Sequence, residues 1–360
     1  MTIGIEEDEA RPSYYQRPIG LSGGPQFYFG TWSGRILIIN TIIFILMTVV
    51  SKSVMQPSEE VLINFGAQDP IRLVQGEWWR LLTPIFVHIG LIHFFFNSYA
   101  LSFIGPQIES FLGAKWFLIL YLLCGICGNI ASGSFHVMIG AGASGAIFGL
   151  IGAGLVLESY IRRSLPEDLK RSRMAWGYTI LAILNLLLGA FIPGIDNAAH
   201  IGGLIAGVGL TVAMLRIRPN RLMLKVPKLG YVTLGIFLIS WIVLASLRIN
   251  KESLHARLNE KADEAYEQIE SSQSKDEIAA ALHKSYYFLS RLLLLDPDAY
   301  EARYKRGRIL MIFGEQNLAM QDLRAIAVDD HYKDKLKDLY YELLAAQRIG
   351  DAEAVRELFE

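Results

Sequence analysis

Residues 140–157 read GAGASGAIFGLIGAGLVL, an uncharged apolar stretch in which Ser144 stands between glycines near the beginning. Its composition is typical of a helix inside a membrane, because about 20 apolar residues are needed to cross a bilayer. Glycines on such a helix allow a neighbouring helix to approach closely. A serine in this setting is usually a packing residue, so Ser144 becomes a candidate for chemistry only together with other polar groups.

Six further stretches are long and apolar enough to cross a membrane. With 143–157, the predicted spans are 36–52, 89–105, 116–132, 176–193, 198–215 and 229–247. The chain is 52% apolar and 19% charged, and most of its charge lies before residue 35, in a few loops and after residue 247. The sequence therefore predicts an all-α fold, a polytopic membrane helix bundle, followed by a soluble helical domain.

Basic residues in two loops predict the orientation of this bundle. The loop at 216–228 contains five basic residues and no acid, and the loop between the fourth and fifth spans is also basic. The loop between the second and third spans, with Glu109 and Lys115, is nearly neutral. Both basic loops should be cytoplasmic, which places the N-terminus inside and the C-terminus outside.

Four regions follow from these patterns. Residues 1–34 form a polar, proline-broken segment, 35–217 the membrane core, 218–250 a basic loop with the seventh span, and 251–360 a helical domain. Within the last region, Asp296 and Asp330 are 34 residues apart, and small residues recur between them. This pattern resembles a tetratricopeptide repeat.

The repeat-like segment has predicted neighbours on both sides. Hairpins at about 253–294 and 332–358 look like degenerate copies, the latter with Gly350 at its turn. Stacked hairpins of this kind leave a groove that suits a peptide or protein partner. The alternative is a helical cap that binds nothing.

Polar residues recur at one depth in three of the predicted spans. The second span contributes His93 and Asn97, four residues apart and so on one helix face, the fourth begins near Ser144, and the sixth near His200. With the predicted orientation, all of them lie a few residues below the outer surface. Polar side chains within a membrane are costly and usually functional.

These residue types suit nucleophilic catalysis. A serine hydroxyl is a weak nucleophile and needs a base within hydrogen-bonding reach, here His200 for Ser144. His93, Asn97 and the backbone amide of Ser144 can donate to an oxyanion. Phe148 lies one turn below Ser144, where its ring can stack on His200 and hold the imidazole without a third acid. Asp196 falls in the outer loop, so the sequence predicts a dyad.

Four motifs occur in an order that resembles the rhomboid family of intramembrane serine proteases. They are GASG at 142–145, His88-x4-His93-x3-Asn97, Ala199-His200-x2-Gly203-x3-Gly207, and the pair Trp79-Arg80. The matches cover about 76–215. The resemblance implies a six-helix catalytic core, to which this chain adds a seventh span. The repeat-like tail is similar to that of a bacterial subgroup of rhomboids, which implies a location in a bacterial plasma membrane.

The resemblance also implies roles for individual residues. Ser144 would be the nucleophile and His200 the base, with His93 and Asn97 in the oxyanion hole. Trp79 and Arg80 would be structural parts of a first loop that spans about 64–88 and is partly embedded in the membrane. Supporting positions are expected at Gly142, Gly145, Phe148, where some relatives have tyrosine, and His88, placed at the membrane interface to close the loop above the site. Substrates would be transmembrane proteins within the lipid bilayer, and no cofactor is implied.

Other classes of function remain as alternatives. A metal site of His88, His93 and His200 is disfavoured because residues 88 and 93 fall on different helix faces and no HExxH motif is present. Cys124 and Cys127, spaced CxxC, are expected to be small packing residues. Aspartyl proteolysis needs acids within the spans, and nucleic-acid binding needs a basic surface, and the sequence has neither. Two hypotheses from other classes remain: a non-catalytic adaptor or chaperone for membrane proteins, and a transporter or channel.

Overall fold

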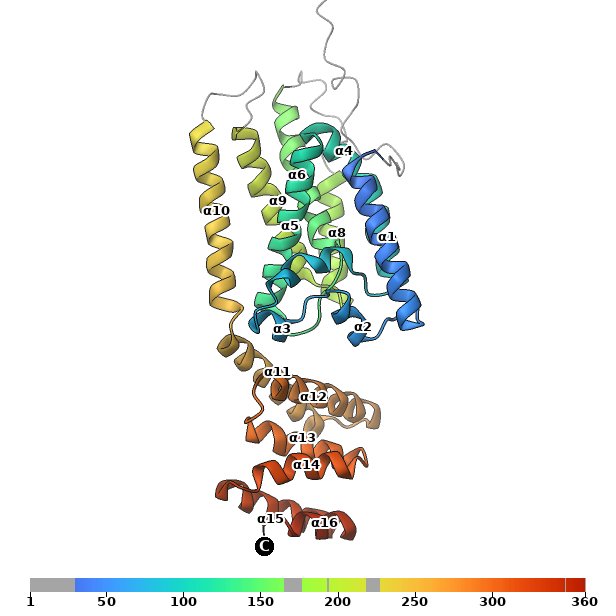
Figure 1. The fold of residues 1–360 in the computed structure, drawn as a ribbon, viewed down its shortest axis with the longest axis vertical. Helices are drawn as coiled ribbons and strands as arrows, with labels where there is room; N and C mark the ends of the chain where they lie inside the picture. Colours follow the sequence, from blue (N-terminus) through green and yellow to red (C-terminus); the bar gives the residue numbers. More distant parts are fainter. Residues whose placement is uncertain (1–29, 165–176, 193, 218–226, 347, 360) are drawn as a thin grey trace, which may run out of the picture. The chain divides into compact units, whose positions relative to one another are not determined.

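The computed structural model describes residues 30–164, 177–192, 194–217, 227–346 and 348–359. Across these ranges the chain is helical and carries one isolated antiparallel bridge, between Gln68 and Gly140. The chain divides into two compact units, Met1–Ile249 and Asn250–Glu360 (Figure 1).

A long helix lies at each of the seven predicted spans in the first unit. The helices are α1 (Trp32–Ser51), α4 (Leu91–Leu112), α5 (Ala114–Phe135), α6 (Ser144–Ser164), α8 (Gly177–Phe191), α9 (Asn197–Ile217) and α10 (Pro227–Arg248). By length and composition within the described residues, α1, α5 and residues 197–215 of α9 can each cross a membrane. Shorter apolar segments lie in α6, α8 and α10. A membrane helix bundle is therefore established, while the exact number of spans stays a prediction.

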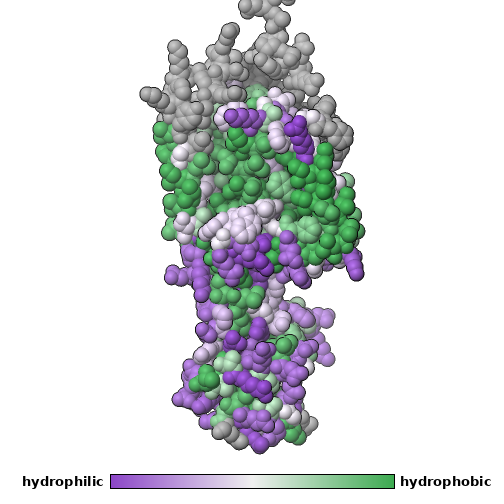
Figure 2. Space-filling view, viewed as in Figure 1, coloured by the Kyte–Doolittle hydropathy of each residue, from purple (hydrophilic) through white to green (hydrophobic). Residues whose placement is uncertain are grey.

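The outer surface of the first unit is apolar. Exposed side chains include Ile45 at 55% and Val49 at 67% on α1, and Phe191 at 82% on α8. Figure 2 shows hydrophobic side chains gathered over the helices of this unit, whereas hydrophilic side chains predominate on the second. Contiguous exposed apolar surface of this kind indicates contact with lipid or with a partner.

The loop predicted between the second and third spans is replaced by helix, because α4 continues further than expected. The helix passes through Pro106 and ends at Leu112, and α5 begins at Ala114 after the single residue Gly113. Lys115 therefore lies in the first turn of α5, and Glu109, expected in a loop, is inside α4 and only 6% exposed.

Glu109 is buried because its carboxylate caps the beginning of α1. Oε1 accepts a hydrogen bond from Trp32 N at 2.7 Å, and Oε2 accepts from both N and Oγ of Ser33 at 2.9 Å. The first amides of a helix have no partner within it, and a negative charge is favoured there. Glu109 thereby joins α4 to α1.

Glycines bring α5, α6 and α9 together so closely that backbone packs on backbone. A methyl group on Gly203 or Gly207 of α9 would collide with the carbonyl oxygen of Gly145 or Gly149 of α6. We call these four residues the glycine seam. Small residues four apart on facing helices are the usual means of such close packing in membranes.

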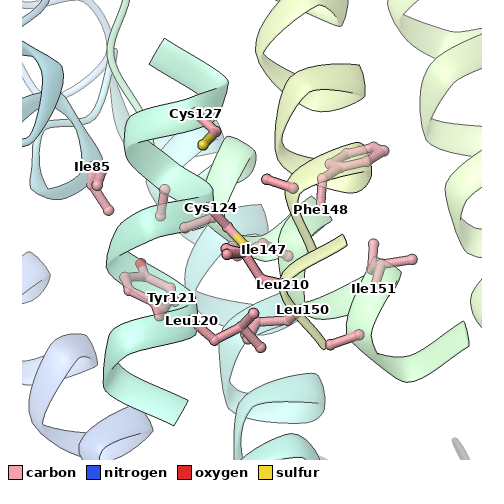
Figure 3. Packing of buried hydrophobic residues seen from close by; sticks show 14 of the residues in the cluster. Ile85, Leu120, Tyr121, Cys124, Cys127, Ile147, Phe148, Leu150, Ile151 and Leu210 are labelled. Atoms are coloured by element: carbon pink, nitrogen blue, oxygen red, sulfur yellow. The ribbon is translucent and has the colours of Figure 1, made fainter. Parts of the chain in front are cut away.

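The cysteines take part in the packing of the same three helices. Cys124 and Cys127 are free and buried, and a methyl group on Gly149 would collide with Cys124. Figure 3 shows Cys124 of α5 converging with Ile147 of α6 and Leu210 of α9 in one apolar cluster. These contacts support the interpretation of both cysteines as packing residues.

The segment between α1 and α4 folds into four short helices. They are α2 (Glu59–Asn64), α3 (Pro70–Val74) and two 3-10 helices, η2 (Trp78–Leu81) and η3 (Thr83–Phe86). Arg80 is 6% exposed and donates to Glu77 Oε2 at 2.6 Å, Ile63 O at 2.7 Å and Ala67 O at 2.9 Å. These bonds make Arg80 a structural residue of the loop. Trp79, in contrast to Arg80, is 56% exposed.

The second unit consists of three helical hairpins. The helices pair as α11 (Lys251–Ser271) with α12 (Lys275–Leu295), α13 (Tyr300–Ile312) with α14 (Gln316–Ile326), and α15 (Asp330–Ala345) with α16 (Ile349–Arg356). Gly307 lies close to Leu323 across the central hairpin, and Gly314 adopts a φ of +80° at its turn. The sequence predicted Gly350 in the turn of the last hairpin. Gly350 lies within α16 instead, because that helix already begins at Ile349.

Candidate active site

Ser144 is held at the first position of α6 by the segment that precedes it. Gln68 and Gly140 exchange backbone hydrogen bonds of 2.8 and 3.0 Å, and Gly142 N donates to Pro84 O at 2.9 Å. These bonds fix residues 140–142 against the loop between α1 and α4. As the first helical residue, Ser144 has a backbone N–H that the helix itself does not use.

His200 lies one turn into α9, whose beginning is capped by Asp196. Asp196 Oδ1 accepts from Ala199 N at 2.9 Å, and Asp196 O accepts from His200 N at 3.1 Å. The same Oδ1 lies 3.3 Å from Nε2 of His136. The Asp196 side chain therefore caps the beginning of α9 and contacts His136, and among the described residues it makes no hydrogen bond to the imidazole of His200.

Phe148 holds the imidazole of His200, as the sequence predicted. The two rings stack with their centroids 4.2 Å apart and their planes 8° from parallel. Both side chains are buried, at 4% exposure for Phe148 and 7% for His200. Because Phe148 lies one turn after Ser144 on α6, the stack also orients His200 relative to the serine.

The glycine seam sets the separation between the two candidate catalytic helices. Gly145 follows Ser144 directly, and Gly203 lies one turn after His200, so the closest backbone contact occurs beside both side chains. Among the described residues no hydrogen bond joins Ser144 to His200. Catalytic hydrogen bonds are often long without substrate and tighten when it binds.

His93 lies against the segment before Ser144. Its Nδ1 accepts from Ile89 N at 3.3 Å, so in the neutral ring the proton is on Nε2. A methyl group on Gly142 would lie 2.5 Å from Cε1 and 2.8 Å from Nε2 of His93, and Gly142 has a φ of +137°. Glycine is thus required there for both space and conformation. The result is an N–H donor next to the backbone that leads to Ser144.

Asn97 and His88 are both buried beside His93. Asn97 is 6% exposed and donates from Nδ2 to His93 O at 3.0 Å, which uses one of its two amide hydrogens within α4. His88 is fully buried, with its ring 5.5 Å from those of both His93 and Phe94. His88 therefore packs behind His93 in the interior of the protein, and its expected place at the membrane interface stays a prediction.

Two polar residues that the sequence analysis did not single out also shape this region. Gln68 is 1% exposed and donates from Nε2 to Asn129 O at 2.7 Å, while Asn129 Nδ2 donates to Leu81 O at 2.9 Å. Together they fasten the loop to α5. Asn129 had a usable signal, an amide within an apolar helix, whereas Gln68 lies in a loop where polar residues are common.

The described arrangement brings Ser144, His200, Phe148 and His93 to the N-terminal ends of α4, α6 and α9. It offers a hydroxyl, a buried imidazole on the adjoining helix and a second imidazole N–H beside the serine's backbone. Such a set can perform acyl transfer through a serine nucleophile. No group of three or more side chains suited to a metal occurs within the described ranges.

The chain is also similar in sequence to known proteins. Residues 75–218 match the Rhomboid domain. The chain is 36% identical over 214 residues to the rhomboid protease GluP of Bacillus subtilis, covering 59% of this chain and 39% of that protein. It is 33% identical over 151 residues to the putative rhomboid protease YdcA of Bacillus subtilis, covering 41% of this chain and 73% of that protein. It is also 28% identical over 264 residues to the rhomboid protease AarA of Providencia stuartii, covering 67% of this chain and 93% of that protein.

Coverage of the relatives is uneven. The chain spans about two-fifths of the length of GluP and 41% of the RHOMBOID-like protein 4 of Arabidopsis thaliana, to which it is 37% identical over 167 residues. Nevertheless, the matched domain contains all four candidate residues, Ser144, His200, His93 and Asn97, and YdcA is matched over most of its length. This chain belongs to the rhomboid family.

Proposed function

We propose that this protein is an intramembrane serine protease that hydrolyses peptide bonds in or next to the transmembrane segments of other membrane proteins. The observation that carries the proposal is the stack of Phe148 on His200 beside the glycine seam, because it fixes a buried imidazole next to the helix that begins with Ser144. In this proposal, residues 35–217 form the catalytic core, and the substrates enter it from the lipid bilayer.

The positions of these residues support the following roles in the proposed reaction. His200 takes the proton of Ser144 Oγ as the oxygen attacks the scissile carbonyl carbon, which forms a tetrahedral intermediate. The negative oxygen is stabilised by the backbone N–H of Ser144, Nε2–H of His93 and the amide of Asn97. His200 then protonates the leaving amine, and an acyl-enzyme remains. Water deprotonated by His200 releases the second product and restores the serine.

A fluorophosphonate probe tests this proposal directly. In detergent, the wild-type protein should be labelled covalently, because the probe reacts with a serine that a neighbouring base has activated. Ser144→Ala should remain unlabelled at the same protein concentration. If the wild type resists the probe while its helical content and melting temperature show a folded protein, the alternative of a non-catalytic adaptor or chaperone is favoured.

Asn97→Ala distinguishes catalysis from packing. Loss of one oxyanion donor typically lowers the rate by on the order of 10²-fold. The stability of the protein should change little, because the hydrogen bond from Asn97 to His93 O lies within a helix that is already packed against the bundle. We expect cleavage of a single-span substrate to slow by about that factor at an unchanged melting temperature. An unstable variant with normal activity per folded molecule would assign Asn97 to packing alone.

For the second unit, we propose a set of tetratricopeptide-like repeats that binds a peptide or protein partner. Three consecutive helical hairpins and the 34-residue spacing from Asp296 to Asp330 support it. Within the central hairpin, Arg306 makes two bonds of 2.7 Å to Asp322, whose side chain is 2% exposed, so this hairpin has a fixed internal geometry.

We also propose that the second unit is on the outer side of a bacterial plasma membrane. The packing of α10 argues against a position along the membrane surface: Phe237 lies against Gly209 of α9, and Trp241 against Gly202, so the two helices run antiparallel. At its end, Arg248 donates to Ser134 O at 3.2 Å, at the end of α5 that leads towards Ser144. With 216–228 cytoplasmic, the chain would leave the bundle on the outer side.

Cysteine labelling tests this topology. In a background with Cys124 and Cys127 replaced by alanine, Asp334→Cys, at a side chain that is 83% exposed, should react with a membrane-impermeant maleimide in intact cells. Lys170→Cys, in the basic loop between the fourth and fifth spans, is the matched control and should react only after the cells are opened. Reaction of Asp334→Cys only after the cells are opened would place the second unit in the cytoplasm.

A further inference from the structure

The helix α10 lies outside the stretch that matches the Rhomboid domain, which ends at residue 218. In this protein, however, α10 is not a peripheral helix. Trp241 is 8% exposed and belongs to the same apolar core as the residues of α5, α6 and α9. Ile242, the next residue, is 62% exposed, so α10 turns one particular face towards the bundle.

Trp241 contacts α9 directly behind the candidate base. A methyl group on Gly202 would lie 3.1 Å from Cη2 of the indole and 2.6 Å from Cβ of Ala131 on α5. Gly202 follows His200 by two residues, which corresponds to about 200° around a helix of 3.6 residues per turn. The indole therefore supports the side of α9 that faces away from His200.

The other side of the same helical turn rests on α6. Gly203 meets the carbonyl of Gly145, and His200 meets the ring of Phe148. The turn of α9 from His200 to Gly203 is thus enclosed between α6 in front and Trp241 with α5 behind. Because glycines make these contacts, α9 has no side chain there that could change its rotamer to compensate for a shift of the helix.

We propose that Trp241 is a positioning residue for His200, and that the catalytic unit of this protein includes α10. This inference rests on the proposed protease function. Removing the indole opens a cavity behind α9 and permits the helix to move away from α6, which lengthens the distance between the imidazole and Ser144. A misplacement of about 1 Å can lower a rate by about 10²-fold.

Trp241→Ala, Trp241→Phe and Ile242→Ala in the full-length protein test the proposal. We measure the second-order rate constant of labelling by a fluorophosphonate, and kcat and KM for a single-span substrate. Trp241→Ala should lower both the labelling rate constant and kcat by about 10-fold or more, with KM within about twofold, because Trp241 lies on the side of α9 that faces away from His200. Trp241→Phe, which keeps a ring but lacks the Cη2 end that faces Gly202, should lose less than Trp241→Ala, and Ile242→Ala, on the exposed face, should behave as wild type.

The outcomes separate the two proposals. If wild type is not labelled, the protease function fails and this inference with it. If wild type is labelled and Trp241→Ala reacts at the same rate per folded molecule, the protease function stands and the positioning role is wrong. Should Trp241→Ala not fold, Trp241→Leu retains part of the ring's volume and is judged by the same rate constants. Equal loss in Ile242→Ala would also overturn the role, because it would indicate a general effect on α10.

Discussion

Ser144→Ala and His200→Ala are each expected to reduce cleavage of a single-span substrate by about 10⁴-fold or more, with no loss of the folded bundle. The hydroxyl and the imidazole act as one unit, so either deletion removes the activated nucleophile. For the same reason the double variant should be no slower than either single variant. Turnover of a purified substrate in detergent or liposomes, normalised to folded protein, measures these effects.

The control for this pair is a buried serine elsewhere in the same unit. Ser102 of α4 is 1% exposed and bonds to Tyr99 O at 2.8 Å, and Ser102→Ala should leave turnover within about twofold of wild type. A single variant at Ser144 or His200 that retains near-wild-type turnover would contradict the dyad. Multiplicative losses in the double variant would show that the two side chains act independently.

Gly203→Ala, a change of one methyl group, is expected to lower turnover by about 10²-fold. The added carbon would collide with the carbonyl oxygen of Gly145, so α6 and α9 must separate by about 1 Å, and such a misplacement between reacting groups can cost about that factor. The loss should appear in kcat and in the rate of fluorophosphonate labelling, because both depend on the distance from His200 to Ser144.

Gly235→Ala provides the matched control, since it makes the same change on an apolar helix where, among the described residues, no atom beyond the helix's own nearby backbone lies within 4 Å of the new carbon. It should keep wild-type turnover and stability. If Gly203→Ala also keeps both, the contact between α6 and α9 does not set the catalytic distance, and the role of the glycine seam would have to be abandoned.

The sequence predicted those features that depend on local patterns within helices. Apolar length located the long helices of the first unit, and the spacing of Phe148 after Ser144 predicted the stack on His200. The glycines near both residues predicted that their helices approach closely. In each case the relevant geometry is the periodicity of a single helix, or a contact between two helices that small residues permit.

Features that depend on long-range hydrogen bonds could not be predicted in this way. Glu109 resembled a loop residue, because a carboxylate is unfavourable within an apolar helix unless distant groups satisfy it. Its partners, Trp32 and Ser33, are more than 70 residues earlier in the chain. Gln68 and Asn129 are similar cases, since their hydrogen bonds form only after the loop between α1 and α4 folds onto α5.

The carboxylate of Glu109 also has a consequence for the order in which the membrane bundle is assembled. A ribosome delivers α1 to the membrane before α4, so the amides of Trp32 and Ser33 are already present when Glu109 arrives. The carboxylate of Glu109 can then be stabilised by hydrogen bonds from an earlier helix, and α4 need not wait for later segments. Biogenesis of this protein would accordingly begin with the pairing of α1 and α4, onto which α6 and α9, the helices of Ser144 and His200, are added afterwards.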